Sequence, residues 1–278
     1  MLIDLHVHSN QSDGTLSPSE VVIHAKDAGR RAIALTDHDT VKGLDEAIEA
    51  GALYQMEIVP GIELSADFPN DNLHILGYYI NYKDKDFLKQ LSPIQDGRNI
   101  RNKKMLDQLH KLGFKITIEE DENIITRAHF AKALLDAGYV ASFDEAFKNY
   151  LSPGKPGYVK RVTPSPKECI DLIHSGGGLA FLAHPTLYGL NTAQLSKLIK
   201  QLAKDGLDGI EAMHSVHNMQ DETYLRTLAS KNNLLISGGS DFHGSNKPNL
   251  EIAVGYGNLK IPYRMLENMK EKIAIQND

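Results

Sequence analysis

The chain of 278 residues has one cysteine, Cys169, and no tryptophan. Cys169 has no second cysteine to pair with, so we expect a reduced, buried side chain that behaves as a small apolar residue. No run of 18 apolar residues is present, and the N-terminus lacks a charged leader followed by an apolar segment. These absences predict a cytoplasmic protein that has no membrane partner and no stable protein partner.

An excess of basic residues is also missing, because 30 Lys and Arg stand against 36 Asp and Glu, for a net charge of −6. A protein that binds nucleic acid by general electrostatic attraction would be basic, so any nucleic-acid substrate must be held locally. Internal repeats and a Gly-x-Ser-x-Gly nucleophile motif are absent. The length and the 41% apolar content suit one sizeable core, such as an α/β barrel.

Short apolar runs along the chain end on residue types that bind metals. Buried parallel strands read as such runs, and in a barrel of strands and helices their C-terminal ends open on one face. Residues far apart in sequence are therefore expected to converge on one pocket. The runs beginning at residues 2, 32, 58, 179 and 234 end on His6 and His8, on Asp37-His38-Asp39, on Glu63, on His184, and on Asp241 and His243.

His6 and His8 show which chemistry to expect. On an extended segment, residues two apart point to the same side. Two imidazoles together with carboxylates suit Zn, Mn or Fe. For this motif alone, a hydrogen-bonded pair of histidines at a strand end is an equal alternative, but the other ligand-type residues in equivalent places weaken it.

The ordered motifs resemble the PHP family, named for polymerase and histidinol phosphatase, from about residue 1 to 255. Within the family the TrpH-like branch is most similar, through Arg127-x-His129-Phe130-Ala131, Gly154-Lys155-Pro156-x-Tyr158-Val159 and Gly176-Gly177-Gly178. The family motifs are Asp4-x-His6-x-His8, Ser12-Asp13-Gly14, Thr36-Asp37-His38-Asp39, Gly61-x-Glu63-x-Ser65, His74-x-x-Gly77, Ala183-His184-Pro185 and Gly239-Ser240-Asp241-x-His243.

The resemblance implies an α/β fold, a distorted seven-stranded barrel, and hydrolysis of phosphate esters at three divalent ions, which could be Mn, Fe or Zn. It assigns His6, His8, Glu63 and Asp241 to one ion and Asp13, His38 and His243 to a second. His74 and His184 would bind the third, with Glu63 shared between ions. Asp13, His38, Glu63 and His243 are the expected catalytic residues.

Sequence patterns also divide the chain. Strands and helices alternate over residues 1–83 and 161–278, which we assign to the barrel. Residues 84–160 are polar and helical in pattern, and we expect a small helical domain inserted over the active face. Ser17 is expected to cap a helix that begins at Pro18. His74 begins its strand, so that strand must run back from the rim as the return arm of a hairpin.

Substrate-binding candidates lie outside the metal motifs. A guanidinium can grip a phosphate with two hydrogen bonds, and His217 follows a strand that opens on the active face. Arg98 and Arg101 are expected to form a solvated basic face. We expect Asp4, Asp37 and Asp39 to accept hydrogen bonds from ligand histidines, with a helix cap or a surface carboxylate as the alternative for each. The expected substrate-binding residues are Arg127, His129, Lys155 and His217.

Three functions are consistent with these features. The resemblance favours a hydrolase that removes the 3′-phosphate of 3′,5′-bisphosphonucleosides and acts on short 5′-phosphorylated RNA. Its alternatives are a histidinol-phosphate phosphatase and, from another class, a non-catalytic accessory module of a polymerase. The complete ligand set and the motifs around Arg127 and Lys155 favour the nucleotide enzyme.

Overall fold

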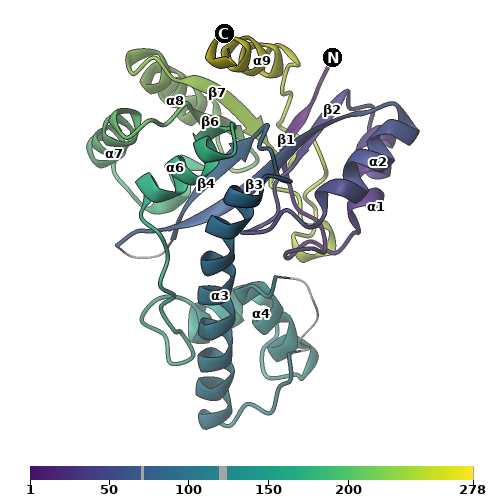
Figure 1. Ribbon diagram of the computed structural model, residues 1–278. Helices are drawn as coiled ribbons and strands as arrows, with labels where there is room; N and C mark the ends of the chain where they lie inside the picture. Colours follow the sequence, from purple (N-terminus) through teal and green to yellow (C-terminus); the bar gives the residue numbers. More distant parts are fainter. Residues whose placement is uncertain (70–71, 119–123, 278) are drawn as a thin grey trace.

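A computed structural model describes residues 1–69, 72–118 and 124–277. Within these residues seven strands form one sheet in the order β1 to β7, and the sheet curls into a nearly closed barrel (Figure 1). The sheet supports the expected PHP-type barrel. The strands are β1 Asp4–Val7, β2 Ala32–Leu35, β3 Glu57–Asp67, β4 Asn72–Tyr78, β5 Leu179–Leu182, β6 Gly209–His214 and β7 Leu235–Gly239.

Strand directions explain how the ligand residues reach one rim. β1, β2 and β3 are parallel, as are β5, β6 and β7, whereas β4 is antiparallel to both of its neighbours. The barrel closes where the backbone N–H of His8 donates to the carbonyl of Phe242 at 2.9 Å and that of Asp241 donates to the carbonyl of His6 at 2.8 Å. The expected hairpin is confirmed, and His74 faces the same rim as the parallel strand ends.

Most strands are short apolar runs because both of their faces are covered. In β2, Ile33 and Leu35 belong to a buried cluster with residues of α1 and α2, while Ala32 and Ala34 join a second cluster that contains Phe181. Burial on both faces removes the alternation of polar and apolar residues expected for a half-exposed strand. The polar residues of these segments are therefore exceptions that need a partner or a ligand.

Helices surround the barrel, and their ends follow local sequence signals. Ser17 and Glu20 form a reciprocal capping box at the start of α1, with Pro18 in the first turn, and Gly29 follows the helix with a φ of +73°. Such a cap contributes about 1 kcal/mol. The barrel helices are α1 Pro18–Asp27, α2 Leu44–Tyr54, α6 Pro166–Ser175, α7 Thr192–Lys204, α8 Met219–Lys231 and α9 Arg264–Asn277, with 3-10 turns at Pro185–Tyr188 and Gly244–Asn246.

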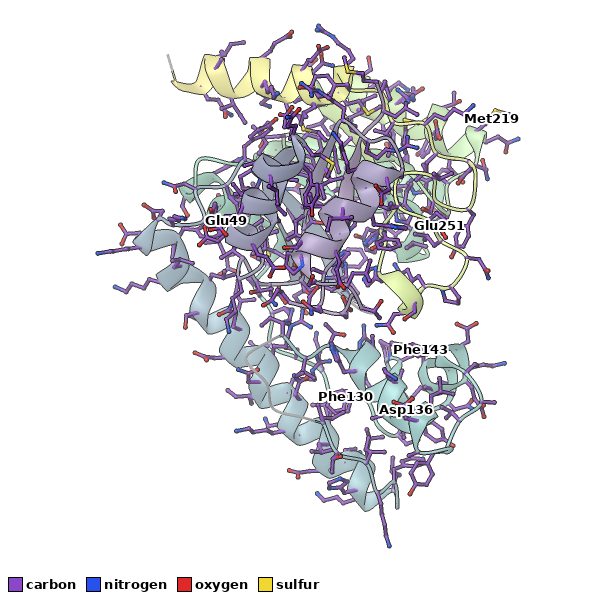
Figure 2. All side chains as sticks on the ribbon, turned by 90° about the vertical axis from the view of Figure 1, so that its right-hand side faces the viewer. Glu49, Phe130, Asp136, Phe143, Met219 and Glu251 are labelled. Carbon is purple, nitrogen blue, oxygen red and sulfur yellow. The ribbon has the colours of Figure 1, made fainter. Side chains whose placement is uncertain are left out.

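A helical lobe interrupts the barrel sequence between β4 and α6. It consists of α3 Lys85–Lys111, α4 Arg127–Asp136, α5 Phe143–Ala146 and a π-helix at Phe147–Leu151. The long α3 extends away from the barrel with α4 beside it (Figure 1). The lobe has its own apolar cluster, in which Phe130 packs with Met105 and Leu109 of α3; Phe130, Asp136 and Phe143 are labelled in Figure 2. The limits of residues 84–160 as a separate domain stay a prediction.

The prediction that the third strand ends on Glu63 was wrong. β3 continues to Asp67, because its second half pairs with β4 from Gly61↔Tyr78 to Asp67↔Asn72. Glu63 thus lies in the middle of a long strand, where pairing on both sides holds its backbone. The hairpin arms project beyond the ends of the shorter strands, so Glu63 still reaches the rim.

Two remaining expectations concern burial. Cys169 is buried in the main apolar cluster, and burial raises the pKa of its thiol, which agrees with an unreactive structural residue. Over residues 1–69, 72–118 and 124–277, none of the helices combines the length and the apolar character that crossing a membrane requires.

Candidate metal centre

Four donor atoms at the barrel rim form a compact set. The Nε2 atoms of His6 and His8 are 3.1 Å apart and lie 3.2 and 3.1 Å from Oε2 of Glu63. Oδ1 of Asp241 lies 3.5 and 3.3 Å from the same two nitrogens. Ligands at about 2.0–2.1 Å from a tetrahedral ion are separated by roughly 3.3–3.4 Å. Donors at these distances can surround a divalent cation, and His6, His8 and Asp241 form one group that could bind a metal, with Glu63 beside the two histidines.

Glu63 also reaches three further histidines. Its Oε2 lies 3.1 Å from Nδ1 of His38, and its Oε1 lies 2.8 Å from Nδ1 of His74 and 3.1 Å from Nε2 of His184. The carboxylate is buried at the centre of the cluster. One carboxylate whose two oxygens face different histidines has the geometry of a ligand shared between cations.

Asp13 and His243 complete a group on the other side of His38. Nε2 of His243 lies 3.2 Å from Oδ1 of Asp13, and Nε2 of His38 lies 3.8 Å from Oδ2. Oδ1 of Asp13 and Nδ1 of His38 and His74 are buried, and although ligand-type atoms lie 2.8–3.2 Å away, none of these contacts within the described part of the chain has hydrogen-bond geometry. Buried polar atoms of this kind are rare unless a ligand completes them, which fits bound cations.

Most of these groups have the charge state that cation binding needs, whereas His6 and His8, whose pKa values are raised, must release a proton to become ligands. Burial lowers the pKa of His38 to about 3 and that of His184 to about 4, although Glu63 opposes both shifts, so these rings are neutral ligands near pH 7. Burial would also lower the pKa of His8, but Asp241 and Glu63 raise it to about 9. The surrounding histidines hold the pKa of Glu63 well below its usual range, against the effect of burial. The cluster thus offers charged carboxylates to cations.

Two of the ligand-type residues have unusual backbones. His184, after β5, has a φ of +26°, and Asp241, after β7, has a φ of +59°. Residues other than glycine rarely adopt positive φ, and such strain persists only where the surroundings enforce it. Strained backbone directly after two barrel strands supports a functional rim.

Comparison with known proteins agrees with this geometry. Residues 4–164 match the PHP domain family. The chain belongs to the PHP family. It is 33% identical to the 3′,5′-nucleoside bisphosphate phosphatase of Chromobacterium violaceum over 87% of each chain, and 32% identical to the 5′-3′ exoribonuclease Rnm of Escherichia coli over 87% of this chain and 85% of that one. A structure from Bifidobacterium adolescentis called a metal-dependent phosphoesterase superposes with a TM-score of 0.85 at 30% identity, covering 96% of this chain and 94% of that one.

Family membership fixes the general chemistry. The barrel is that of a PHP metal-dependent phosphoesterase, and the protein is a hydrolase. The described residues hold several groups of His, Asp and Glu side chains that could bind metals.

Glu211 in β6 is a site residue that the sequence patterns did not reveal. Its carboxylate is buried, with Oε1 3.0 Å from Nδ1 of His6, and its Oε2 accepts a 2.8 Å hydrogen bond from the backbone N–H of His184. Glu211 therefore orients one histidine ring and one strained backbone. The signal available in the sequence was a lone acid inside the apolar run Gly209–Met213.

Replacing Glu211 with glutamine is expected to weaken cation binding by about 10- to 100-fold, since partners of metal-bound histidines contribute about that much. The side-chain shape is retained, so folding should persist. Chelator competition would give the affinity for Mn²⁺, and circular dichroism would monitor folding. Glu49→Gln, on the exposed face of α2 (Figure 2), makes the same charge change away from the site and should leave the affinity unchanged. Equal affinities in all three proteins would contradict this role.

The expectation that Asp4, Asp37 and Asp39 accept hydrogen bonds from histidine rings was wrong. Asp37 accepts from Ser9 and Ser12, both at 2.6 Å through their hydroxyls, and Asp4 holds the backbone and hydroxyl of Ser240. These carboxylates fix the loops that carry Asp13 and Asp241, because a buried carboxylate must be surrounded by donors. Asp39 instead binds arginines.

The expectation that Arg98 and Arg101 are solvated was also wrong. Their exposed fractions are 5% and 6%, because the inner face of α3 packs on the barrel rim. Together with Arg161 they line a pocket beside the candidate cation ligands. The pocket lining is Asp13, His38, Ser65, His74, Arg98, Arg101, Thr126, Arg127, Ala128, Phe147 and Arg161.

Among the predicted substrate-binding residues, only Arg127 lines this pocket. His129 turns its Nδ1 back to the N–H of Thr126 at 3.0 Å, capping α4, and lines a separate hollow with Lys132. Lys155 is exposed. His217 is buried beside His214, with its Nδ1 3.0 Å from the carbonyl of Ala212. The structure thus does not bring these three to the cation pocket, and their roles stay predictions.

Proposed function

We propose that this PHP protein hydrolyses the 3′-phosphate of nucleoside 3′,5′-bisphosphates and also acts on short 5′-phosphorylated RNA. The observation that carries the proposal is one pocket that is lined both by ligand-type residues and by arginines. Such a pocket suits a substrate with two phosphate groups, one of which reacts while the other is held by guanidinium groups. The named activities of the two relatives support the same substrate class.

We further propose three divalent cations, Mn, Fe or Zn, because nitrogen and oxygen ligands suit all of these metals. The shared position of Glu63 between two groups of histidines supports more than one cation. The proposed ligands are His6, His8, Glu63 and Asp241 for one cation, Asp13, His38 and His243 for a second, and His74, His184 and Glu63 for the third.

When bound, such cations polarise the phosphoryl group, neutralise its oxygens and lower the pKa of water. The chain supplies the geometry. Glu63 would hold cations through both of its oxygens, and Asp13 and His243 would hold a cation that binds the reacting ester. Arg127 would orient the substrate through its distant phosphate, and binding energy from that group contributes to the rate by positioning the ester.

A substrate panel tests the proposal. Mn-loaded protein would be assayed with adenosine 3′,5′-bisphosphate, histidinol phosphate, 5′-phosphorylated short RNA and a generic aryl phosphate, measuring phosphate or nucleotide release. We expect the bisphosphate to give the highest kcat/KM. Preference for histidinol phosphate would identify a histidinol-phosphate phosphatase instead. No turnover of any substrate by metal-replete protein would favour the accessory-module alternative.

Replacing Arg127 with alanine should reduce kcat/KM for adenosine 3′,5′-bisphosphate about ten- to a hundredfold, the effect of one charge-assisted contact. The half-buried guanidinium lines the pocket between the rings of Phe147 and Tyr158, 5.9 and 5.8 Å from their centroids. Adenosine 3′-monophosphate lacks the distant phosphate and should change little. Arg264→Ala, exposed on α9, is the control. Equal losses for both substrates would place Arg127 at the reacting phosphate or in a structural role.

A further inference from the structure

The hydroxyl of Tyr188 lies between the two chain segments that carry His74 and His184. It accepts a hydrogen bond of 3.0 Å from the backbone N–H of His74 in β4, and it donates one of 2.9 Å to the carbonyl of Ala183, the residue before His184. Tyr188 is the last residue of the 3-10 turn that follows His184. One side chain thus ties together the backbones at two ligand-type histidines.

This hydroxyl takes the place of a direct hydrogen bond between strands. β4 and β5 are antiparallel, and their register, which includes Ile75↔Leu182, brings His74 opposite Ala183. Opposed residues at a hydrogen-bonded position exchange two backbone bonds. Here the N–H of Ala183 donates directly to the carbonyl of His74 at 3.1 Å, whereas the return path runs through the hydroxyl of Tyr188. The separation of the two segments at the rim therefore depends on that oxygen.

The backbone matters here because the ring of His184 has little else to orient it. Its Nε2 lies 3.1 Å from Oε1 of Glu63, but its buried Nδ1 has no hydrogen-bond partner within the described residues. Metal-binding histidines usually donate their second ring N–H to an acceptor that fixes the ring. Orientation of His184 must come instead from neighbouring rings and from its strained backbone, with a φ of +26°. Glu211 holds its N–H, and Tyr188 holds the preceding carbonyl.

Tyr188 is itself held in place. Its ring centroid lies 5.9 Å from that of Phe68 and 5.7 Å from that of His184. Pro185 begins the turn, and its ring fixes the backbone φ there. The spacer is therefore positioned by the fold, before any cation binds.

We propose that Tyr188 is the positioning residue that sets the distance between His74 and His184 and so determines whether the cation of these two histidines is held. This role rests on the proposed function, which assigns one of three cations to this pair together with Glu63. Phenylalanine at position 188 would keep the ring and remove the oxygen. The two segments would then either pair directly or leave a buried N–H and carbonyl without partners. In both cases the backbones at the two histidines lose their defined spacing.

Metal analysis of Tyr188→Phe tests this role without a substrate. The protein would be dialysed against a series of buffered Mn²⁺ concentrations and analysed for bound ions per chain. One ion per chain should require about 10- to 100-fold more Mn²⁺ than in the unsubstituted protein, the effect of losing a partner of a metal-bound histidine. The other ions should keep their affinities within about twofold. Tyr224→Phe is the matched control, because it removes a hydroxyl that donates at 2.6 Å to the carbonyl of Thr192, and it should change no affinity.

Two further measurements separate positioning from a general effect on folding. Hydrolysis of an aryl phosphate by Tyr188→Phe should be slow at the Mn²⁺ concentration that saturates the unsubstituted protein, and should recover when Mn²⁺ is raised about 10- to 100-fold. In a His74→Ala background the ligand pair is already broken, so adding Tyr188→Phe should release no further ion.

Ion counting is independent of the substrate, so the outcomes differ from a failure of the proposed function. If adenosine 3′,5′-bisphosphate is a poor substrate, selective loss of one ion in Tyr188→Phe still supports the role of Tyr188. Equal ion counts and affinities in this variant and the unsubstituted protein would overturn it. Equal weakening of all ions together with a lower Tm would show a general structural role and would overturn it as well.

Discussion

Removal of divalent cations by a chelator is expected to abolish phosphate-ester hydrolysis by this PHP protein, and Mn²⁺ or a similar ion is expected to restore it. Ligand-type residues from both halves of the barrel converge on one buried cluster. Among the described residues that line the pocket, the hydroxyl of Ser65 donates to Asp39, and that of Thr126 caps α4 by accepting from the N–H of Ala128. Without the cations, the reacting phosphoryl group would face the carboxylates of the cluster with no metal charge to offset them.

The measurement combines turnover with elemental analysis of the same samples. Activity should fall with metal content and return in proportion to the Mn²⁺ bound. Circular dichroism would reveal whether the chelator acts merely by unfolding the protein. Re-addition of Ca²⁺, a cation that prefers oxygen ligands, compares the recovery of turnover with that given by Mn²⁺. Full activity of protein shown to be metal-free would refute the requirement.

Replacing Glu63 with glutamine should reduce the rate at least ~10²-fold, or about 2.7 kcal/mol of transition-state stabilisation. Its two oxygens face different histidines, with Oε2 3.2 Å from His6 and Oε1 2.8 Å from His74. The amide keeps the shape but removes the charge that two cations would share. More than one cation site should therefore be weakened at once.

Metal stoichiometry is the decisive readout for Glu63. The Glu63→Gln variant should bind fewer ions per chain than the unsubstituted protein, and the loss should affect more than one site. Glu49→Gln serves again as the exposed control and should bind the full number. Normal stoichiometry with near-normal turnover would show that Glu63 does not bridge cations.

Much of the site could be predicted because each ligand-type residue lies in a short, recognisable segment. His6 and His8 are two residues apart at a strand end, so their side chains point to the same side. His74 begins its strand, which predicted that this strand runs antiparallel to the one before it. The roles of Asp4 and Asp39 could not be predicted, since a carboxylate beside a histidine in sequence can turn to donors elsewhere. Asp39 turns to arginines 59 and 122 residues away.

By itself the sequence determined the family, the alternation of strands and helices, the capped start of α1 and the nine ligand-type residues. Local signals decide these features, because apolar period and cap chemistry act over a few residues. Tertiary structure alone decided the length of β3, the role of Glu211 and the burial of Arg98 and Arg101. These three features depend on contacts between segments that are distant in sequence. A basic stretch on a helix has the same sequence whether it faces water or packs on a barrel rim.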